Sequence, residues 1–169
     1  MKGLENQSYL FMLLAFNVLA IIFLVTAIKW PRIGRLLFFA LFAWASWMNW
    51  TTSQRSPNEY LRYADLNFSQ WYSDFINGWF SKHIPAVVGF IATCQGLIAI
   101  SMVWKGPLYK IGCTGGVIFL LAIAPLGVGS GFPCTITFAI ALIILFRKGN
   151  NYLWNSKDWK AYSFKKQDL

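Results

Sequence analysis

The stretch Ile111–Phe146 reads IGCTGGVIFLLAIAPLGVGSGFPCTITFAIALIILF and is apolar throughout, except for a glycine-rich break at its centre. A helix crosses the ~30 Å hydrocarbon layer of a bilayer in about 20 residues, so this stretch is too long for one span. The break at 129–133 reads GSGFP, which is typical of a turn, and Pro133 suits the first turn of a following helix. The stretch therefore predicts two membrane-spanning helices, 111–128 and 133–146, joined by a tight turn.

Three other apolar stretches precede this hairpin, at 9–29, 35–52 and 84–104. The whole chain is 57% hydrophobic and only 12% charged, whereas soluble domains are about half apolar and a quarter charged. The sequence therefore predicts an all-α, polytopic integral membrane bundle of five transmembrane helices, a four-helix core plus an N-terminal helix, forming one domain over 1–169. A secretory signal peptide at 9–29 is disfavoured, because the basic residues follow the apolar run instead of preceding it.

The basic residues are sorted by the side of the membrane on which each gap would lie. The gaps at 29–35 and 105–110 and the tail at 147–169 together hold eleven basic and two acidic residues. The N-terminal residues and the loop at 51–83 hold four of each. Because cytoplasmic loops carry the excess of Lys and Arg, we expect the N-terminus outside and the C-terminus in the cytoplasm of a bacterial inner (plasma) membrane. The net charge of +9 then favours anionic lipid headgroups and disfavours a nucleic-acid partner.

The long external loop has the periodicity of a helix over 57–80. Apolar residues recur there every three or four positions, at Leu61, Ala64, Phe68, Trp71, Phe75 and Trp79. This pattern predicts an amphipathic helix that lies in the membrane interface or over the mouth of the bundle. Ser56 and Glu59 have the spacing of a capping box at its start. The tail at 147–169 mixes lysines with Tyr152, Trp154, Trp159 and Tyr162, so we expect it to rest on the cytoplasmic leaflet.

The cores of the predicted spans contain no Asp, Glu, Lys or Arg. Proton relays and ion pathways usually need such groups inside the membrane, so a pump is disfavoured and a passive channel or transporter is the least favoured class. A single histidine and the scattered Cys94, Cys113 and Cys134 provide neither a metal-ligand set nor a disulfide framework. We therefore predict no catalytic residue, no metal site and no intrinsic cofactor.

Small residues and a proline indicate the local geometry of the fourth span. Gly112 and Gly116 form a GxxxG pattern, which is typical of close packing between helices. Pro125 lies further along the same span and is expected to kink it.

Four residues are candidate ligand contacts: His83, Gln95, Trp44 and Trp47. His83 either begins the third span at headgroup level or exchanges a proton with a quinone ring at the membrane surface. Gln95 is the most polar residue deep in a span and either hydrogen-bonds a neighbouring helix or contacts a ligand; Asn49 has the same two interpretations. Trp44 and Trp47 either belong to the interfacial aromatic belt or line a pocket for a prenyl chain.

From about residue 35 to 146 the layout resembles the DoxX-like family of small four-helix membrane proteins. A first helix is followed by a long aromatic external segment that ends near Trp79 and by a second helix with the patch Thr93-Cys94-Gln95-Gly96. The closing hairpin with APLGVGSGFP at 124–133 carries most of the similarity. The helix at 9–29 lies outside the resemblance.

The resemblance implies a non-catalytic or accessory subunit of a quinone-linked membrane redox assembly. Its partners would be membrane lipids and other membrane protein subunits, and a quinone would be its ligand. The residues themselves also fit a second hypothesis, a small membrane enzyme or binding protein for a lipid or prenyl chain, with the external aromatic helix as a lid and His83 and Gln95 at its site. These two hypotheses predict different partners and remain open at the level of sequence.

Overall fold

The computed structural model describes residues 7–148 and 153, and within these residues the chain is helical with no strand. Five long helices cover the five predicted apolar stretches: α1 (Gln7–Lys29), α2 (Pro31–Arg55), α5 (Ile84–Val103), α6 (Gly106–Ile123) and α7 (Cys134–Lys148). Short elements connect them: η1 (Pro57–Arg62), α3 (Tyr63–Leu66), α4 (Gln70–Asn77), η2 (Phe80–Lys82) and η3 (Ala124–Ser130). The aromatic and basic tail beyond Lys148 lies outside the described residues, apart from Leu153.

Three helical segments are long and apolar enough to cross a membrane: Tyr9–Lys29, Ile84–Val103 and Gly106–Ser130. The chain therefore has the character of an integral membrane protein, as the sequence predicted. Helix α2 is 25 residues long but less apolar, and helix α7 is only 15 residues long. Both pack against the apolar helices, α2 along α5 and α7 against α1 and α6.

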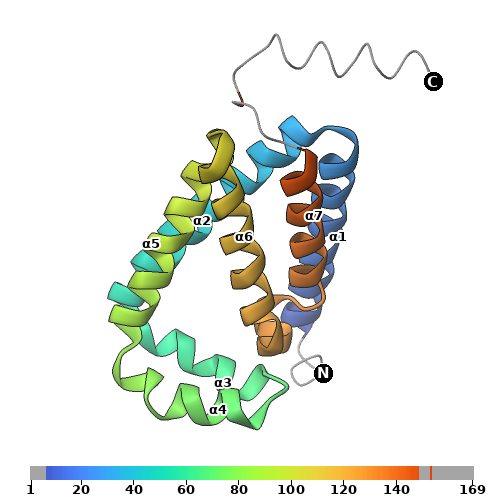
Figure 1. Ribbon diagram of the computed structural model, residues 1–169. Helices are drawn as coiled ribbons and strands as arrows, with labels where there is room; N and C mark the ends of the chain where they lie inside the picture. The colour runs from blue at the N-terminus through green and yellow to red at the C-terminus, as the bar shows by residue number, and fades with distance from the viewer. Residues whose placement is uncertain (1–6, 149–152, 154–169) are drawn as a thin grey trace, which may run out of the picture.

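The long helices form two groups that meet at one end and diverge at the other (Figure 1). One group is the pair α2 and α5, and the other contains α1, α6 and α7. We call the end where the groups meet, near Lys29, Trp104 and Leu145, the packed end. We call the opposite end the open end, and there residues 57–82, the crossing segment, bridge the two groups.

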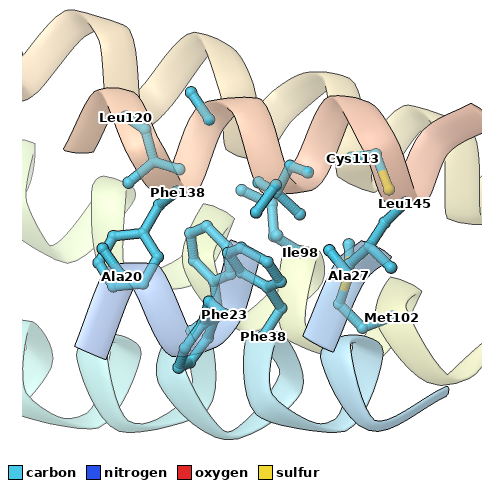
Figure 2. Packing of buried hydrophobic residues seen from close by; sticks show 14 of the residues in the cluster. Ala20, Phe23, Ala27, Phe38, Ile98, Met102, Cys113, Leu120, Phe138 and Leu145 are labelled. Carbon is cyan, nitrogen blue, oxygen red and sulfur yellow. The ribbon is translucent and has the colours of Figure 1, made fainter. Parts of the chain in front are cut away.

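Aromatic side chains fill the space between the two groups toward the packed end. The Phe38 side chain is fully buried, and the Phe23 ring meets it edge to face with 4.9 Å between ring centroids. Phe138 meets Phe23 in the same way at 4.9 Å, and Phe42 stacks on Phe38 at 6.2 Å. These rings come from α1, α2 and α7 and form one continuous core (Figure 2). Edge-to-face and offset pairs are the arrangements that aromatic rings prefer.

A buried arginine joins four helices at the packed end. The Arg35 Nε donates a hydrogen bond of 2.8 Å to the Met102 carbonyl oxygen, and Nη2 donates to the Trp104 carbonyl oxygen. The guanidinium lies 4.1 Å above the Tyr109 ring, whose hydroxyl donates to the Leu145 carbonyl oxygen at 2.8 Å. Two carbonyls at the end of α5, which have no partner within that helix, are thereby satisfied. The sequence placed Arg35 in a basic gap, but α2 begins four residues earlier and buries this side chain completely.

The GxxxG pattern lies at a close helix contact, as predicted. A Cβ added at Gly112 would lie 1.6 Å from the Ser101 Oγ of α5, and one at Gly116 would lie 2.7 Å from a Leu142 methyl group of α7. Helix α6 can approach both neighbours only because these positions have no side chain. Helix α6 ends at Ile123, and Pro125 lies in the 3-10 helix that follows.

The crossing segment is not the single helix over 57–80 that the sequence predicted. It consists of four short helical pieces, and its main break falls at Asn67, Phe68 and Ser69. The Asn67 Oδ1 accepts a hydrogen bond from the Ser69 N–H at 2.9 Å, while its amide nitrogen donates to the Ala64 carbonyl at 2.8 Å. Asparagine side chains that bond nearby backbone groups in this way compete with helix formation.

The predicted capping box at the start of this segment is also wrong. The Ser56 side chain makes no capping hydrogen bond, and only its carbonyl oxygen accepts from the Glu59 N–H at 3.1 Å. The Glu59 carboxylate instead pairs with Arg62 at 3.2 Å. The segment therefore starts as a 3-10 helix, which brings Tyr60 back toward the end of α2.

Candidate functional site: an apolar cavity between the helix groups

The divergence of the two helix groups leaves a cavity of about 690 Å³. Its walls come from all five long helices, and residues of the crossing segment also line it. Most lining residues are apolar or aromatic, including Phe16, Leu41, Phe42, Phe119, Leu120 and Phe138. Small-molecule sites are concave, mostly apolar and about 300–1,000 Å³ in volume, so this cavity has the size and lining of a ligand site.

The crossing segment is fixed over the cavity by contacts with the hairpin of α6 and α7. The Tyr72 hydroxyl donates a hydrogen bond of 2.7 Å to the Ala122 carbonyl oxygen, and the Phe68 N–H donates to the Pro125 carbonyl oxygen at 3.0 Å. The Tyr63 ring lies against Gly129 so closely that a Cβ there would be 2.4 Å from the ring. The crossing segment therefore lies across one side of the cavity and is hydrogen-bonded to the opposite helix group.

A chain of three polar side chains forms one wall of the cavity. Gln95 is 2% exposed, and its Oε1 accepts a hydrogen bond of 2.8 Å from the Asn49 Nδ2. The Tyr60 hydroxyl donates to the Asn49 Oδ1 at 3.0 Å, so the chain links α5, α2 and the crossing segment. All three residues line the cavity. This network leaves polar groups at the cavity surface without introducing a charge.

Tyr60 and Tyr63 of the crossing segment both have raised pKa values. Burial, with a smaller contribution from Tyr63, raises the pKa of Tyr60 to about 12. Burial also raises the pKa of Tyr63, with smaller contributions from Tyr9 and Glu59. The two phenols are therefore neutral at physiological pH, and the Tyr60 hydroxyl keeps the proton that it donates to Asn49.

The cavity wall has no unpaired formal charge among the described residues. Glu59 and Arg62 are the two charged residues of its lining, and they pair with each other at 3.2 Å at an exposed position. A charged ligand would find no opposite charge in this apolar space, and an unpaired charge in such surroundings is costly. The lining therefore favours an uncharged ligand.

The structure brings two of the four predicted ligand contacts to the cavity. Gln95 and Trp44 line it, although the Trp44 side chain is 52% exposed. Trp47 is 62% exposed and lies outside the lining. His83 also lies outside it: its ring stacks on Trp79 with 4.5 Å between centroids, and its Nδ1 is 2.8 Å from the Trp79 carbonyl oxygen.

Tyr60 and Thr135 are two of the polar lining residues that the sequence did not predict as ligand contacts. Tyr60 joins the site only because the turn after α2 folds back toward Asn49, and no local pattern indicates this. Thr135 lines the cavity near the start of α7, and its side chain is 2% exposed. Among the described residues, its Oγ1 is the one buried side-chain oxygen or nitrogen without a hydrogen-bond partner.

The chain matches no protein-family model, no curated protein and no solved structure. The resemblance to the DoxX-like family therefore stays a prediction from layout. The fold and the cavity show a helical membrane protein with an apolar cavity between its two helix groups.

Proposed function

We propose that this chain is a membrane protein that binds the apolar chain of a lipid or prenyl compound in the cavity between its two helix groups. The main evidence for this proposal is the cavity itself. Its volume of about 690 Å³, its aromatic and aliphatic walls and its uncharged polar groups suit an amphiphile with a long apolar part. The crossing segment would act as the lid of this site.

The charge distribution supports five spans, with the packed end in the cytoplasm and the N-terminus outside. The described part of the chain has seven basic and no acidic residues near the packed end: Lys29, Arg32, Arg35, Lys105, Lys110, Arg147 and Lys148. Near the open end it has three basic residues, Arg55, Arg62 and Lys82, and three acidic residues, Glu59, Asp65 and Asp74. This arrangement follows the positive-inside rule for a bacterial plasma membrane. Helices α2 and α7 would span with the apolar helices against which they pack.

An accessory role in a quinone-linked redox assembly is compatible with such a cavity. An isoprenoid quinone combines an apolar chain with an uncharged ring, so it belongs to the ligand class proposed above. A channel or passive transporter fits less well, because the aromatic core of Phe23, Phe38 and Phe138 fills the space toward the packed end.

The proposed function is tested by identifying what copurifies with the protein. The full chain is purified in a mild detergent, and bound compounds are extracted and identified by mass spectrometry. We expect one class of uncharged amphiphile at close to one equivalent. Ala45→Trp places a large side chain in the cavity lining and should abolish this retention.

The matched control is Ala86→Trp, because Ala86 is exposed on α5 and lies outside the cavity lining. This variant should retain the compound at the wild-type level. If wild type and both variants carry the same mixture of bulk lipid, the proposed function is wrong.

A further inference from the structure

The Thr135 hydroxyl lies in the cavity lining, and the binding of an apolar chain alone gives it no role. It is buried in the wall, and a buried hydroxyl without a hydrogen bond is destabilising to the folded chain. Natural proteins satisfy nearly all such groups, so an exception calls for a physical reason.

Other threonines in the helices of this chain show how the hydroxyl is usually satisfied. Thr26 Oγ1 donates to the Phe23 carbonyl oxygen at 2.9 Å, and Thr93 Oγ1 donates to the Gly89 carbonyl oxygen at 2.9 Å. These are bonds back to the preceding turn of the same helix, which threonine commonly makes. Thr135 makes no such bond.

The carbonyl one turn before Thr135 already has other donors. The Gly131 carbonyl oxygen accepts from the Cys134 N–H at 3.0 Å and from the Asn17 Nδ2 at 3.3 Å. Gly131 itself has a φ of +72°, a left-handed conformation that turns the chain into α7. The tight turn thus leaves the Thr135 hydroxyl at the cavity wall without a backbone partner.

The position of Thr135 also determines what kind of atom would bind there. It is the second residue of α7, at the end of the helix where the backbone dipoles leave partial positive charge. The N–H groups of Cys134, Ile136 and Thr137 already bond to the Gly131 and Pro133 carbonyl oxygens. The Thr135 hydroxyl, and not these N–H groups, could therefore still bond an oxygen atom of the ligand. No unpaired cation lines the cavity among the described residues, so a carboxylate or phosphate would lack the opposite charge that its burial needs.

We propose that the Thr135 hydroxyl, at the start of α7, binds the polar head of the ligand, and that this head is an uncharged hydroxyl or carbonyl oxygen. This inference rests on the proposed function, because it assigns one contact within that cavity. The Thr135 Oγ1 donates to, or accepts from, the ligand oxygen, and the apolar part of the ligand extends along the aromatic walls.

The test compares three probes with closely similar eighteen-carbon chains and different heads: oleyl alcohol, oleate and octadecene. Each is titrated into the full, delipidated chain in detergent, and binding is followed by native mass spectrometry and by the rise in unfolding temperature. We expect wild type to bind oleyl alcohol roughly fivefold more tightly than octadecene, the effect of one hydrogen bond. Oleate should bind more weakly than the alcohol.

Thr135→Val removes the hydroxyl with little change in shape and should bind the alcohol and the hydrocarbon alike. Thr135→Ser keeps the hydroxyl and should retain the preference. Thr26→Val is the matched control, because it removes a buried hydroxyl that is already bonded within α1, away from the cavity. The ligand-free Thr135→Val chain should be at least as stable as wild type, since the lost hydroxyl had no partner.

The inference is overturned if Thr135→Val keeps the preference for the alcohol or if oleate binds most tightly. Wild-type binding of all three probes with equal affinity would overturn the assignment of Thr135 alone, because the cavity would still bind apolar chains. Failure of every probe to bind would overturn the proposed function itself.

Discussion

The packed end and the open end are built from the same five long helices, yet one is filled and the other is hollow. At the packed end the Phe38 ring is fully buried and Arg35 bonds across to α5. At the open end the helix groups separate around about 690 Å³, and short helices bridge them. Protein interiors are normally packed as densely as organic crystals, and only the packed end approaches that density.

Small residues bring helices into contact at the packed end. A Cβ added at Gly34 would lie 3.2 Å from the Ala27 backbone, and one at Gly112 would lie 1.6 Å from the Ser101 Oγ. Toward the open end, large side chains such as Phe16 and Phe119 line the cavity. Close packing in one half of the molecule thus coexists with an unfilled space in the other half.

Truncation of a core ring should distinguish the two ends most strongly. Phe38→Ala should lower the free energy of unfolding by about 3–5 kcal/mol, as for other buried Phe-to-Ala changes. Lipid is as apolar as the core, so most of this loss would come from lost packing with Phe23 and Phe138. Phe75→Ala removes a 37% exposed ring from the lid and should cost about 1 kcal/mol or less. Unfolding by dodecyl sulfate in mixed micelles measures both, and equal losses would contradict the comparison.

Replacement of the buried arginine should have the next largest effect. Arg35→Lys cannot reach the Met102 and Trp104 carbonyl oxygens with the same planar fork and loses the stacking on Tyr109. We expect a loss of about 2 kcal/mol, within the range for hydrogen bonds to charged groups. Arg55→Lys, at an exposed position near the open end, is the control and should be neutral. A loss as large at Arg55 would show that the packed end has no special dependence on guanidinium geometry.

Replacement by alanine should have opposite effects on stability at two glycines of α6, Gly112 and Gly115. Gly112→Ala would place a Cβ 1.6 Å from the Ser101 Oγ and force α5 and α6 apart, at a cost of about 1–2 kcal/mol. Gly115→Ala would meet its nearest neighbour, Ile98, at 3.7 Å and should be neutral or slightly stabilising, because alanine favours helix. Mixed-micelle unfolding of the two variants side by side tests this, and the reverse order would refute close approach at Gly112.

The smallest expected effect concerns the polar wall of the open end. Tyr60→Phe removes the hydrogen bond to Asn49 and should cost about 0.5–1 kcal/mol near pH 7. Burial, with a further rise from Tyr63, brings the pKa of Tyr60 to about 12 in the folded chain, against 10.0 for an ordinary tyrosine. As pH rises above 10, the unfolded chain loses this proton first, so folding stability falls up to pH 12. The stability difference between wild type and Tyr60→Phe should shrink over this window and then change sign; a constant difference would contradict the raised pKa of Tyr60.

The long helices could be predicted from sequence because their signal is local. The apolar stretches and the break at 129–133 are visible in the residues themselves, and a helix begins at Cys134, next to Pro133. Gln95 could be predicted as a helix–helix or ligand contact for the same reason, because a polar residue deep in an apolar stretch needs a partner. The structure gives it one, Asn49 of α2.

The residues that sequence reasoning missed depend on contacts between distant segments. Asn67 breaks the crossing segment through bonds that form only in the folded turn, and Arg35 is buried because α5 and α6 end and begin beside it. Thr135 looks like an ordinary helix residue, and nothing in the local sequence indicates that its hydroxyl has no hydrogen-bond partner. His83 and Trp47 were two of the four candidate ligand contacts, and both are exposed and lie outside the cavity lining.

The hydrogen bonds of the crossing segment have a mechanical consequence. The segment is continuous with α2 at one end and with α5 at the other, and between them it is bonded to Ala122 and Pro125 on the opposite group. It therefore ties the two helix groups together at the open end, and the groups can separate further there only if these bonds break. Under the proposed function, a slender apolar chain could enter beside the segment, whereas a wide, rigid ligand would require the Tyr72 and Phe68 hydrogen bonds to break. The width of the ligand would then matter for binding as well as its length, which the aromatic core limits.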